Sequence, residues 1–154
     1  MRRIHLCTGV LERAGSLLLA ASRYPNHEQP LWNLPGGRVR EGELLADALR
    51  REWREETGLD AVAQRLLYVS ESFDRAGGVH VVNATFAVAA RGEPRLPPDD
   101  AHVVALEWTP RDRIAQHIAV AVVREPLLAW LAGDERRYYA FSDAGITVEF
   151  ADEP

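Results

Sequence analysis

The stretch GGRVREGELLADALRREWREETGL, residues 36–59, decides the fold of this chain and raises a question of electrostatics. Its apolar spacing predicts a helix over about residues 43–57. Three carboxylates, Glu52, Glu55 and Glu56, crowd the last turn and a half of that helix. The C-terminal end of a helix carries partial negative charge, and like charges three or four residues apart repel each other. We therefore expect another group to offset this repulsion.

The direction in which the carboxylates point narrows the choice of that group. At about 100° per residue they project within an arc of roughly 100°, and apolar residues lie in or beside the same arc. The ordinary alternative is a surface helix with intrahelical ion pairs, such as Arg51 with Glu55, which contribute little. That alternative does not explain why the carboxylates share the apolar direction, where desolvation is costly. The other charged residues, Asp47, Arg50, Arg51 and Arg54, are predicted to form the solvated face.

A hard divalent cation would offset the repulsion. Mg²⁺ or Mn²⁺ takes oxygen ligands and is commonly held by a few carboxylates together with substrate phosphates. Gly36 and Gly37, just before the helix, fit this interpretation because glycine lets the backbone approach a ligand closely, although a plain turn also uses such residues. Gly58 provides the usual C-terminal stop of the helix.

The spacing within this stretch resembles the signature of the Nudix hydrolases, the MutT-like family. Gly37 is followed after five residues by Glu43, and after seven more by REWREETGL, residues 51–59. Every fixed position of the signature is filled, and the one departure is Trp53, where the family usually has an aliphatic residue. The preceding LWNLPGG is also similar to the family's usual approach to this box.

The resemblance implies one domain over residues 1–154, an α/β/α sandwich with a mixed β-sheet, and a Nudix box at residues 37–59. It also implies that water attacks phosphorus, with Mg²⁺ or Mn²⁺, in a phosphoanhydride of a nucleoside diphosphate linked to another group or of a nucleoside triphosphate. Such chemistry needs positioning and charge neutralisation rather than a nucleophilic side chain. Two alternatives stay open: a Nudix-fold module that senses a nucleotide without cleaving it, and a hydrolase of dinucleoside polyphosphates or RNA 5′ ends.

Catalytic roles follow from the same resemblance, residue by residue. Glu52, Glu55 and Glu56 would be metal ligands, with the Gly37 carbonyl as a further ligand. Either Glu52 or Glu55 would orient or deprotonate the attacking water. The expected substrate is a small nucleotide.

Four more residues receive supporting roles. The resemblance implies that Glu43 and Arg51 hold the box together through ion pairs and hydrogen bonds. Arg23 is similar in position to an arginine that often contacts phosphate in the family, although an exposed arginine at a strand end is equally ordinary. Gly36 is expected to bring the backbone close to the substrate.

The rest of the chain predicts mixed strands and helices, which indicates an α/β or α+β domain. Residues 3–10 and 16–23 are expected to pair as a hairpin that turns at Gly15, and residues 65–73 and 79–90 as a second hairpin. The remaining elements are a strand over 102–108, a helix with a Thr109 cap and Pro110 at its first position, a helix over much of 118–132 with Pro126 in its first turn or at a kink, and a closing hairpin over 136–150 that turns at 143–145.

Composition narrows the class of protein. A chain of 154 residues with 47% apolar content suits one domain with one core. A net charge of -5 and a pI near 5.5 argue against a general nucleic-acid-binding surface. The single cysteine, Cys7, allows neither a disulfide framework nor a cysteine-rich zinc site, which fits a reducing setting. Glu12 and Arg13 interrupt the N-terminal apolar runs, so we expect a cytoplasmic protein without a membrane span.

Other residues have weaker claims to a role. Asp99 and Asp100 could add a carboxylate for metal or base work, but turn formation explains them more simply. Glu107 could approach the site from a strand end, but it is expected to face solvent. The closing hairpin could pair with a second copy in a homodimer or cover a sheet edge. The aromatic residues Trp32, Tyr68 and Phe73 could stack on a base but are expected in the core, and the five histidines show no ligand spacing.

Overall fold

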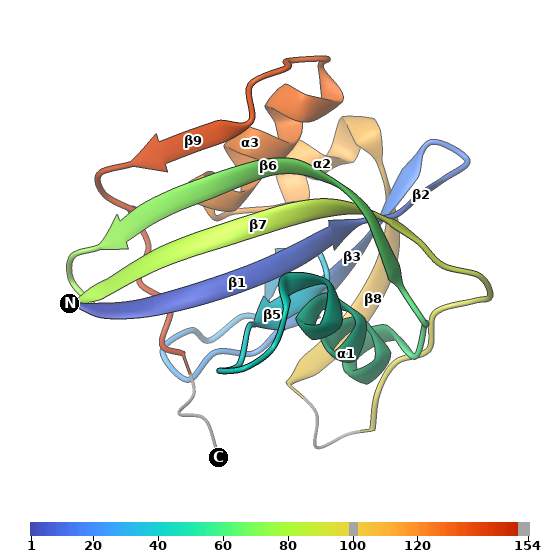
Figure 1. Cartoon of the computed structure of the whole chain (residues 1–154), viewed down its shortest axis with the longest axis horizontal. Coiled ribbons are helices and arrows are strands. Elements are labelled where there is room, and N and C mark those ends of the chain that lie inside the picture. The colour runs from blue at the N-terminus through green and yellow to red at the C-terminus, as the bar shows by residue number, and fades with distance from the viewer. Residues whose placement is uncertain (99–101, 151–154) are drawn as a thin grey trace.

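Two β-sheets lie between helices in this protein (Figure 1). The computed structural model describes residues 1–98 and 102–150. Neighbouring strands of the first sheet are parallel in two pairs and antiparallel in the other two, so this sheet is mixed. Its strands, in spatial order, are β5 (Gly36–Arg38), β1 (Arg2–Val10), β7 (Val79–Ala89), β6 (Val62–Asp74) and β9 (Tyr138–Phe141).

The second sheet is antiparallel and is built around one central strand, β3 (Ser16–Ser22). Strand β8 (Val103–Pro110) pairs along the full length of β3. Strands β2 (Glu12–Arg13) and β4 (Leu31–Asn33) pair with the two ends of β3.

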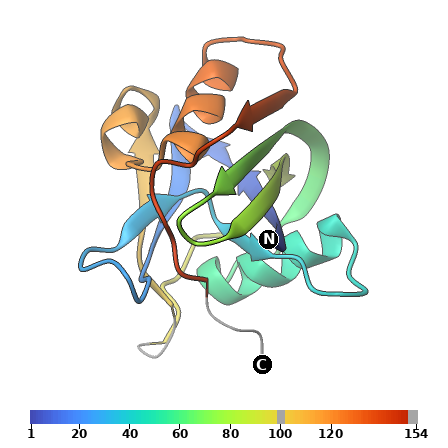
Figure 2. The same ribbon diagram turned by 90° about the vertical axis from the view of Figure 1, so that its left-hand side faces the viewer.

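Helices cover both outer sides of this β structure (Figure 2). Helix α1 (Leu45–Thr57) lies on one side. The 3₁₀ turn η1 (Arg111–Arg113) and the helices α2 (Ile114–His117) and α3 (Ala121–Leu131) lie on the other. No helix in the described ranges is long and apolar enough to span a bilayer.

Successive side chains of β3 alternate between two hydrophobic cores, one on each side of the second sheet. Leu17 and Leu19 pack in the cluster that contains Leu127 of α3, whereas Leu18 packs in the cluster that contains Trp53 of α1. Successive side chains of a strand point to opposite faces, so β3 is buried on both sides. The predicted α/β/α sandwich with a mixed sheet is confirmed.

Helix α1 begins two residues later than predicted and ends where predicted. Gly58 adopts a left-handed conformation, φ 73°, and its N–H donates to the carbonyl of Arg54. Such a conformation is the usual reason for glycine at this position. The buried face of the helix consists of Ala48, Leu49, Trp53 and Thr57.

The predicted hairpin between residues 3–10 and 16–23 is wrong in its pairing. Both strands exist, but β1 lies in the first sheet and β3 in the second. The turn itself is real: Ala14 and Gly15 both have positive φ and join β3 to the short strand β2. Two such residues favour the tight hairpin turn that reverses the chain locally. Strand β8 occupies one edge of β3, and β2 and β4 occupy the other, so β3 has no edge left to pair with β1.

The second predicted hairpin is confirmed, since β6 and β7 pair antiparallel. The closing hairpin over 136–150 is wrong, because β9 pairs parallel with β6 and residues 142–150 form no strand. Strand β9 therefore covers the edge of β6 within the same chain.

The region after β8 also differs from the prediction. Thr109 does not cap a helix but pairs with Leu17 inside the second sheet, and Pro110 ends that strand. Helix α3 confirms the predicted helix within residues 118–132, but Pro126 lies inside it, at a buried position, rather than in its first turn, and the alternative of a kink stays a prediction. The prediction for Thr109 failed because its pairing partner in the sheet, Leu17, lies far away in the sequence.

Candidate functional site

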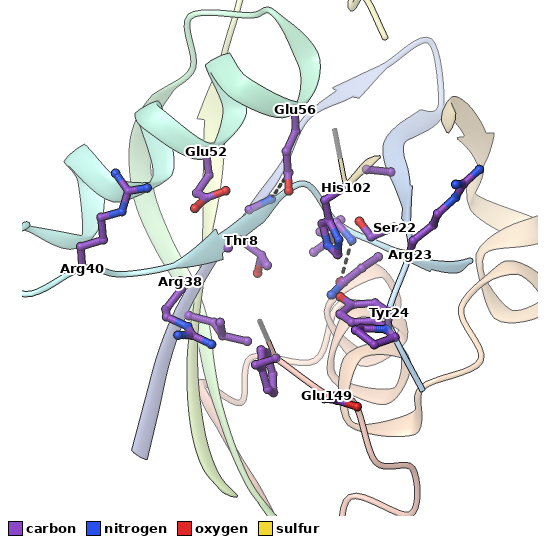
Figure 3. Close-up of a pocket in the computed structure, with 18 residues that line it drawn as sticks. Thr8, Ser22, Arg23, Tyr24, Arg38, Arg40, Glu52, Glu56, His102 and Glu149 are labelled. Carbon is purple, nitrogen blue, oxygen red and sulfur yellow. Dashed lines mark hydrogen bonds between the residues drawn. The ribbon is translucent and has the colours of Figure 1, made fainter. Parts of the chain in front are cut away.

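A cavity of about 310 Å³ opens beside the C-terminal half of helix α1 (Figure 3). Glu52 and Glu56 point into it from α1, with Arg38 and Arg40 on one side. The opposite side is formed by Arg23, Tyr24 and His102. The site thus combines carboxylates and arginines around one space.

The two glycines of β5 allow the backbone to pass under α1. A Cβ atom on Gly36 would lie 2.0 Å from the carbonyl oxygen of Cys7 in the neighbouring strand. A Cβ atom on Gly37 would lie 2.5 Å from the carboxylate carbon of Glu52. The obstacle at Gly36 is backbone, so the close contact of β5 with β1 requires glycine there, whereas a side chain at Gly37 would push the Glu52 carboxylate out of its present position.

Glu56 is partly buried against this glycine strand. Its Oε2 accepts a hydrogen bond from the Gly36 N–H at 2.9 Å. Loss of surrounding water, and then the negative charge of Glu52, raise the pKa of Glu56 well above the usual range. A positive ion beside this carboxylate would favour its ionised form.

Glu52 lies next to Glu56 on the cavity side of the helix. Its side chain is only 16% exposed, and its Oε1 accepts a hydrogen bond from Arg51 Nη1 at 2.8 Å. Desolvation raises the pKa of Glu52 even though the Arg51 charge opposes that shift. Two neighbouring carboxylates therefore both resist ionisation here.

Arg51 joins the loop before the helix to the helix itself. Its guanidinium donates to both carboxylate oxygens of Glu43, at 2.8 and 2.9 Å, and to the Arg38 carbonyl at 3.0 Å. The Arg51 hydrogen bonds lower the pKa of Glu43 to about 2. These are the contacts expected of two residues that hold the box together.

The predicted solvated arginine face is wrong for Arg51, whose side chain is only 19% exposed. The helical wheel places it opposite the cavity, but the loop carrying Glu43 folds back over it. Arg50 and Arg54 do face solvent, where both pair with Asp60.

Glu55, the third predicted ligand, stands apart from the other two. Its side chain is 55% exposed, and its nearest cationic partner is Arg51 Nη1 at 3.6 Å. Within residues 1–98 and 102–150, no three His, Cys, Asp or Glu side chains are grouped closely enough to hold a metal ion. The structure thus brings together Glu52 and Glu56, and Glu55 would have to turn toward them to share a cation.

The available donors nevertheless suit a hard cation. Glu52, Glu56 and the backbone carbonyls of the glycine strand offer only oxygen atoms, which Mg²⁺ and Mn²⁺ prefer. The two carboxylates also repel each other without one. The donor set therefore fits such an ion.

Sequence reasoning singled out Arg23 but missed Arg38 and Arg40, which also line the cavity. Their spacing of two residues directly after the glycine pair was the available signal, because alternate residues of an extended segment share a face. Tyr24 and His102 were missed as well; their rings meet edge to face, with centroids 5.1 Å apart. No local pattern in the sequence joins these two.

The other candidate residues lie elsewhere. Asp99 and Asp100 fall outside the described residues. Glu107 is paired with His117, with an oxygen-to-nitrogen distance of 2.7 Å. Tyr68 is buried in the core, and the Phe73 ring packs against His80.

A smaller cavity of about 90 Å³ adjoins the first one. Tyr24, Asn33 and Phe150 are among the residues that line both. Its walls are mainly apolar and include Trp32, and polar residues of β6 and β7, Asp74 among them, also face it. A ligand at the glutamates could therefore extend into a largely apolar space.

Comparison with known proteins gives a consistent result. The NUDIX domain family matches residues 1–131. An ADP-ribose pyrophosphatase from Methanocaldococcus jannaschii is 37% identical over 93 residues, which is 60% of this chain and 54% of that protein. A CTP pyrophosphohydrolase from Escherichia coli K12 is 38% identical over 61 residues, 40% of this chain and 45% of that protein. The chain thus spans about half the length of these two relatives.

A solved structure agrees with these sequence matches. The crystal structure of a MutT NUDIX hydrolase from Burkholderia pseudomallei has a TM-score of 0.62 and 34% identity to this chain. The superposition covers 73% of this chain and 86% of the other.

Proposed function

The chain belongs to the NUDIX family, and on this premise we propose that it is a pyrophosphohydrolase that uses Mg²⁺ or Mn²⁺. Its substrate would be a nucleoside triphosphate or a nucleoside diphosphate derivative. The observation that carries the proposal is the pair of carboxylates, Glu52 and Glu56, facing an arginine-lined cavity. Relatives named as pyrophosphatases of ADP-ribose and CTP support the same class of substrate.

Glu52, Glu56 and the Gly37 carbonyl would hold the cation, with Glu55 as a further ligand. When bound, the cation neutralises phosphate charge and lowers the pKa of a water molecule. Glu56 is held in position by the Gly36 N–H, and Glu52 by Arg51. These contacts keep two carboxylate groups oriented before any substrate arrives.

The chain's own residues then bind the substrate. Arg38 and Arg40, on one side of the cavity, suit phosphate oxygens, because guanidinium groups bind phosphate through two parallel hydrogen bonds. Arg23 lines the opposite side, although Figure 3 shows its guanidinium directed away from the glutamates. We assign the larger share of phosphate binding to Arg38 and Arg40.

Proton transfer falls to Glu52 rather than Glu55, the other candidate base. Glu52 faces the cavity, whereas the Glu55 side chain is 55% exposed, so Glu52 is better placed to accept a proton from a water molecule in the cavity. The water oxygen bonds to phosphorus and its proton moves to a Glu52 oxygen. The bridging P–O bond breaks, and the phosphate or nucleotide that keeps the bridging oxygen leaves.

The test is a substrate screen with and without Mg²⁺. The panel contains nucleoside triphosphates, nucleotide sugars, ADP-ribose, coenzyme A and dinucleoside polyphosphates, with products separated by chromatography. We expect hydrolysis that Glu52→Gln and Glu56→Gln each reduce by at least about 100-fold. Glu125→Gln, on the exposed side of α3, is the matched control. Nucleotide binding without any product would instead favour the sensing module.

A further inference from the structure

Residues 142–150, which we name the C-terminal strap, cross from the first sheet to the second (Figure 2). They follow β9 and lie beyond residues 1–131, the part of the chain that matches the family. The family match therefore does not account for what the strap does.

One end of the strap is fixed to the first sheet. The Ala144 N–H donates to the Phe73 carbonyl at 2.8 Å. The Thr147 hydroxyl donates to the carboxylate of Asp74 at 3.0 Å. Both contacts are made at the end of β6.

The other end is hydrogen-bonded to the loop between β3 and β4 of the second sheet. Asn26 Nδ2 donates to the Thr147 carbonyl at 2.6 Å, and Asn26 Oδ1 accepts from the Glu149 N–H at 3.0 Å. His27 Nε2 lies 2.8 Å from the same Thr147 carbonyl oxygen, so two neighbouring side chains of this loop make three contacts to the strap, which we name the clasp. The strap is held at two points on two different sheets.

Between these points the strap forms part of the wall of both cavities. Glu149 and Phe150 line the larger cavity, and the Phe150 ring lies 5.7 Å from the Arg38 guanidinium. Ile146, Val148 and Phe150 line the smaller one. Together the two cavities, of about 310 and 90 Å³, lie near the lower end of the roughly 300–1,000 Å³ usual for small-molecule sites.

We propose that the C-terminal strap determines substrate specificity by enclosing a single nucleoside unit, with Phe150 as the contacting aromatic group. This inference rests on the proposed function. Phosphates held near Glu52 and Arg38 leave the rest of the nucleotide beside the strap. Its apolar side chains suit a flat base, while the carboxylate of Glu149 repels further phosphates. A wall at this position disfavours dinucleoside polyphosphates and RNA 5′ ends, which carry a further nucleoside beyond the phosphates.

Two variants test the strap in different ways. Phe150→Ala removes the aromatic contact but keeps the clasp. The double variant Asn26→Ala/His27→Ala removes all three clasp contacts through two residues outside the cavity lining. Glu28→Ala, an exposed residue of the same loop, is the matched control. Thermal unfolding of each variant verifies that the domain remains folded.

Binding is measured by calorimetry with an α,β-methylene nucleoside triphosphate and Mg²⁺, and activity with nucleoside triphosphates and diadenosine tetraphosphate. We expect Phe150→Ala to weaken binding of the analogue roughly tenfold, the effect of losing one aromatic–base contact. For both variants the kcat/KM ratio of the dinucleotide to the mononucleotide should rise about tenfold. In the unaltered protein the analogue should slow amide hydrogen exchange across residues 142–150.

The outcomes separate the two proposals. Wild-type-like binding and substrate ratios in both variants, or unchanged hydrogen exchange in the strap, would overturn the strap proposal while hydrolysis by the parent protein upholds the function. Binding without hydrolysis would overturn the function and leave the strap to be judged by affinity and exchange. Absence of both binding and hydrolysis would overturn both.

Discussion

Replacing Glu56 by glutamine should raise stability and remove activity at the same time. The substitution keeps the shape of the side chain. It also leaves an oxygen to accept the hydrogen bond that the Gly36 N–H donates to Glu56 Oε2, at 2.9 Å in the unaltered protein. It removes the negative charge that burial and Glu52 both disfavour. A residue retained for metal binding at the expense of the fold should show these opposite effects.

The expected gain follows from the environment of the carboxylate. Each pKa unit by which folding raises a carboxyl group weakens the ionised fold by about 1.4 kcal/mol. Because Glu56 is partly buried and keeps one hydrogen bond, we expect Glu56→Gln to raise the free energy of unfolding by about 1–2 kcal/mol at pH 8. For a domain of this size that corresponds to a rise in Tm of roughly 2–8 °C.

The pH dependence has a definite sign. Below pH 4.5, the ordinary pKa of glutamate, the carboxyl is protonated in both the folded and unfolded states, so Glu56 and the glutamine variant should be equally stable. Above pH 4.5 the Glu56 carboxyl ionises freely in the unfolded protein, whereas burial and the Glu52 charge oppose its ionisation in the folded protein. The wild-type free energy of unfolding should therefore fall, relative to Glu56→Gln, as pH rises through the raised pKa.

Circular dichroism melts between pH 4 and 8, with EDTA and then with Mg²⁺, provide the assay. Mg²⁺ should raise the Tm of the unaltered protein and raise that of Glu56→Gln less. Glu55→Gln is the control, since its side chain is 55% exposed and its removal should change the Tm in EDTA little. A variant Glu56→Gln that is less stable than the parent in EDTA at pH 8 would refute the reasoning.

Two further predictions concern the surroundings of the site. Arg51→Lys should lower the free energy of unfolding by about 2 kcal/mol in urea denaturation, because lysine cannot reproduce the paired contacts to Glu43 and the bond to the Arg38 carbonyl; a loss below about 0.5 kcal/mol would contradict it. Cys7 is fully buried and its pKa is raised to about 12, chiefly by desolvation, so at pH 8 the native thiol should react with a disulfide reagent at least about 100-fold more slowly than in denaturant; equal rates would contradict it.

The spacing of residues within short segments of the sequence predicts part of this fold. Helix α1 could be predicted because its apolar positions repeat with the helical period and Gly58 tolerates the left-handed stop. Strands β6 and β7 could be paired because a short turn joins them. The fixed distances from Gly37 to Glu43 and Glu56 identified the family for the same reason, since they lie within one short segment.

Tertiary structure decided what depends on residues far apart. Strand β1 pairs with β7, more than seventy residues later in the chain, and no local signal predicts that choice over the adjacent β3. The same limit hid the burial of Arg51, which depends on a loop folding over it, and the meeting of Tyr24 with His102.

The sequence by itself determined the central groups of the site, a glycine pair and a cluster of glutamates at set intervals. Only the packed chain determined their use, turning Glu52 and Glu56 toward a cavity, leaving Glu55 exposed and bringing the C-terminal strap into the cavity wall. Periodicity fixes the direction of a side chain relative to its own helix or strand. The side of that element which meets water is set by segments that arrive from elsewhere in the chain.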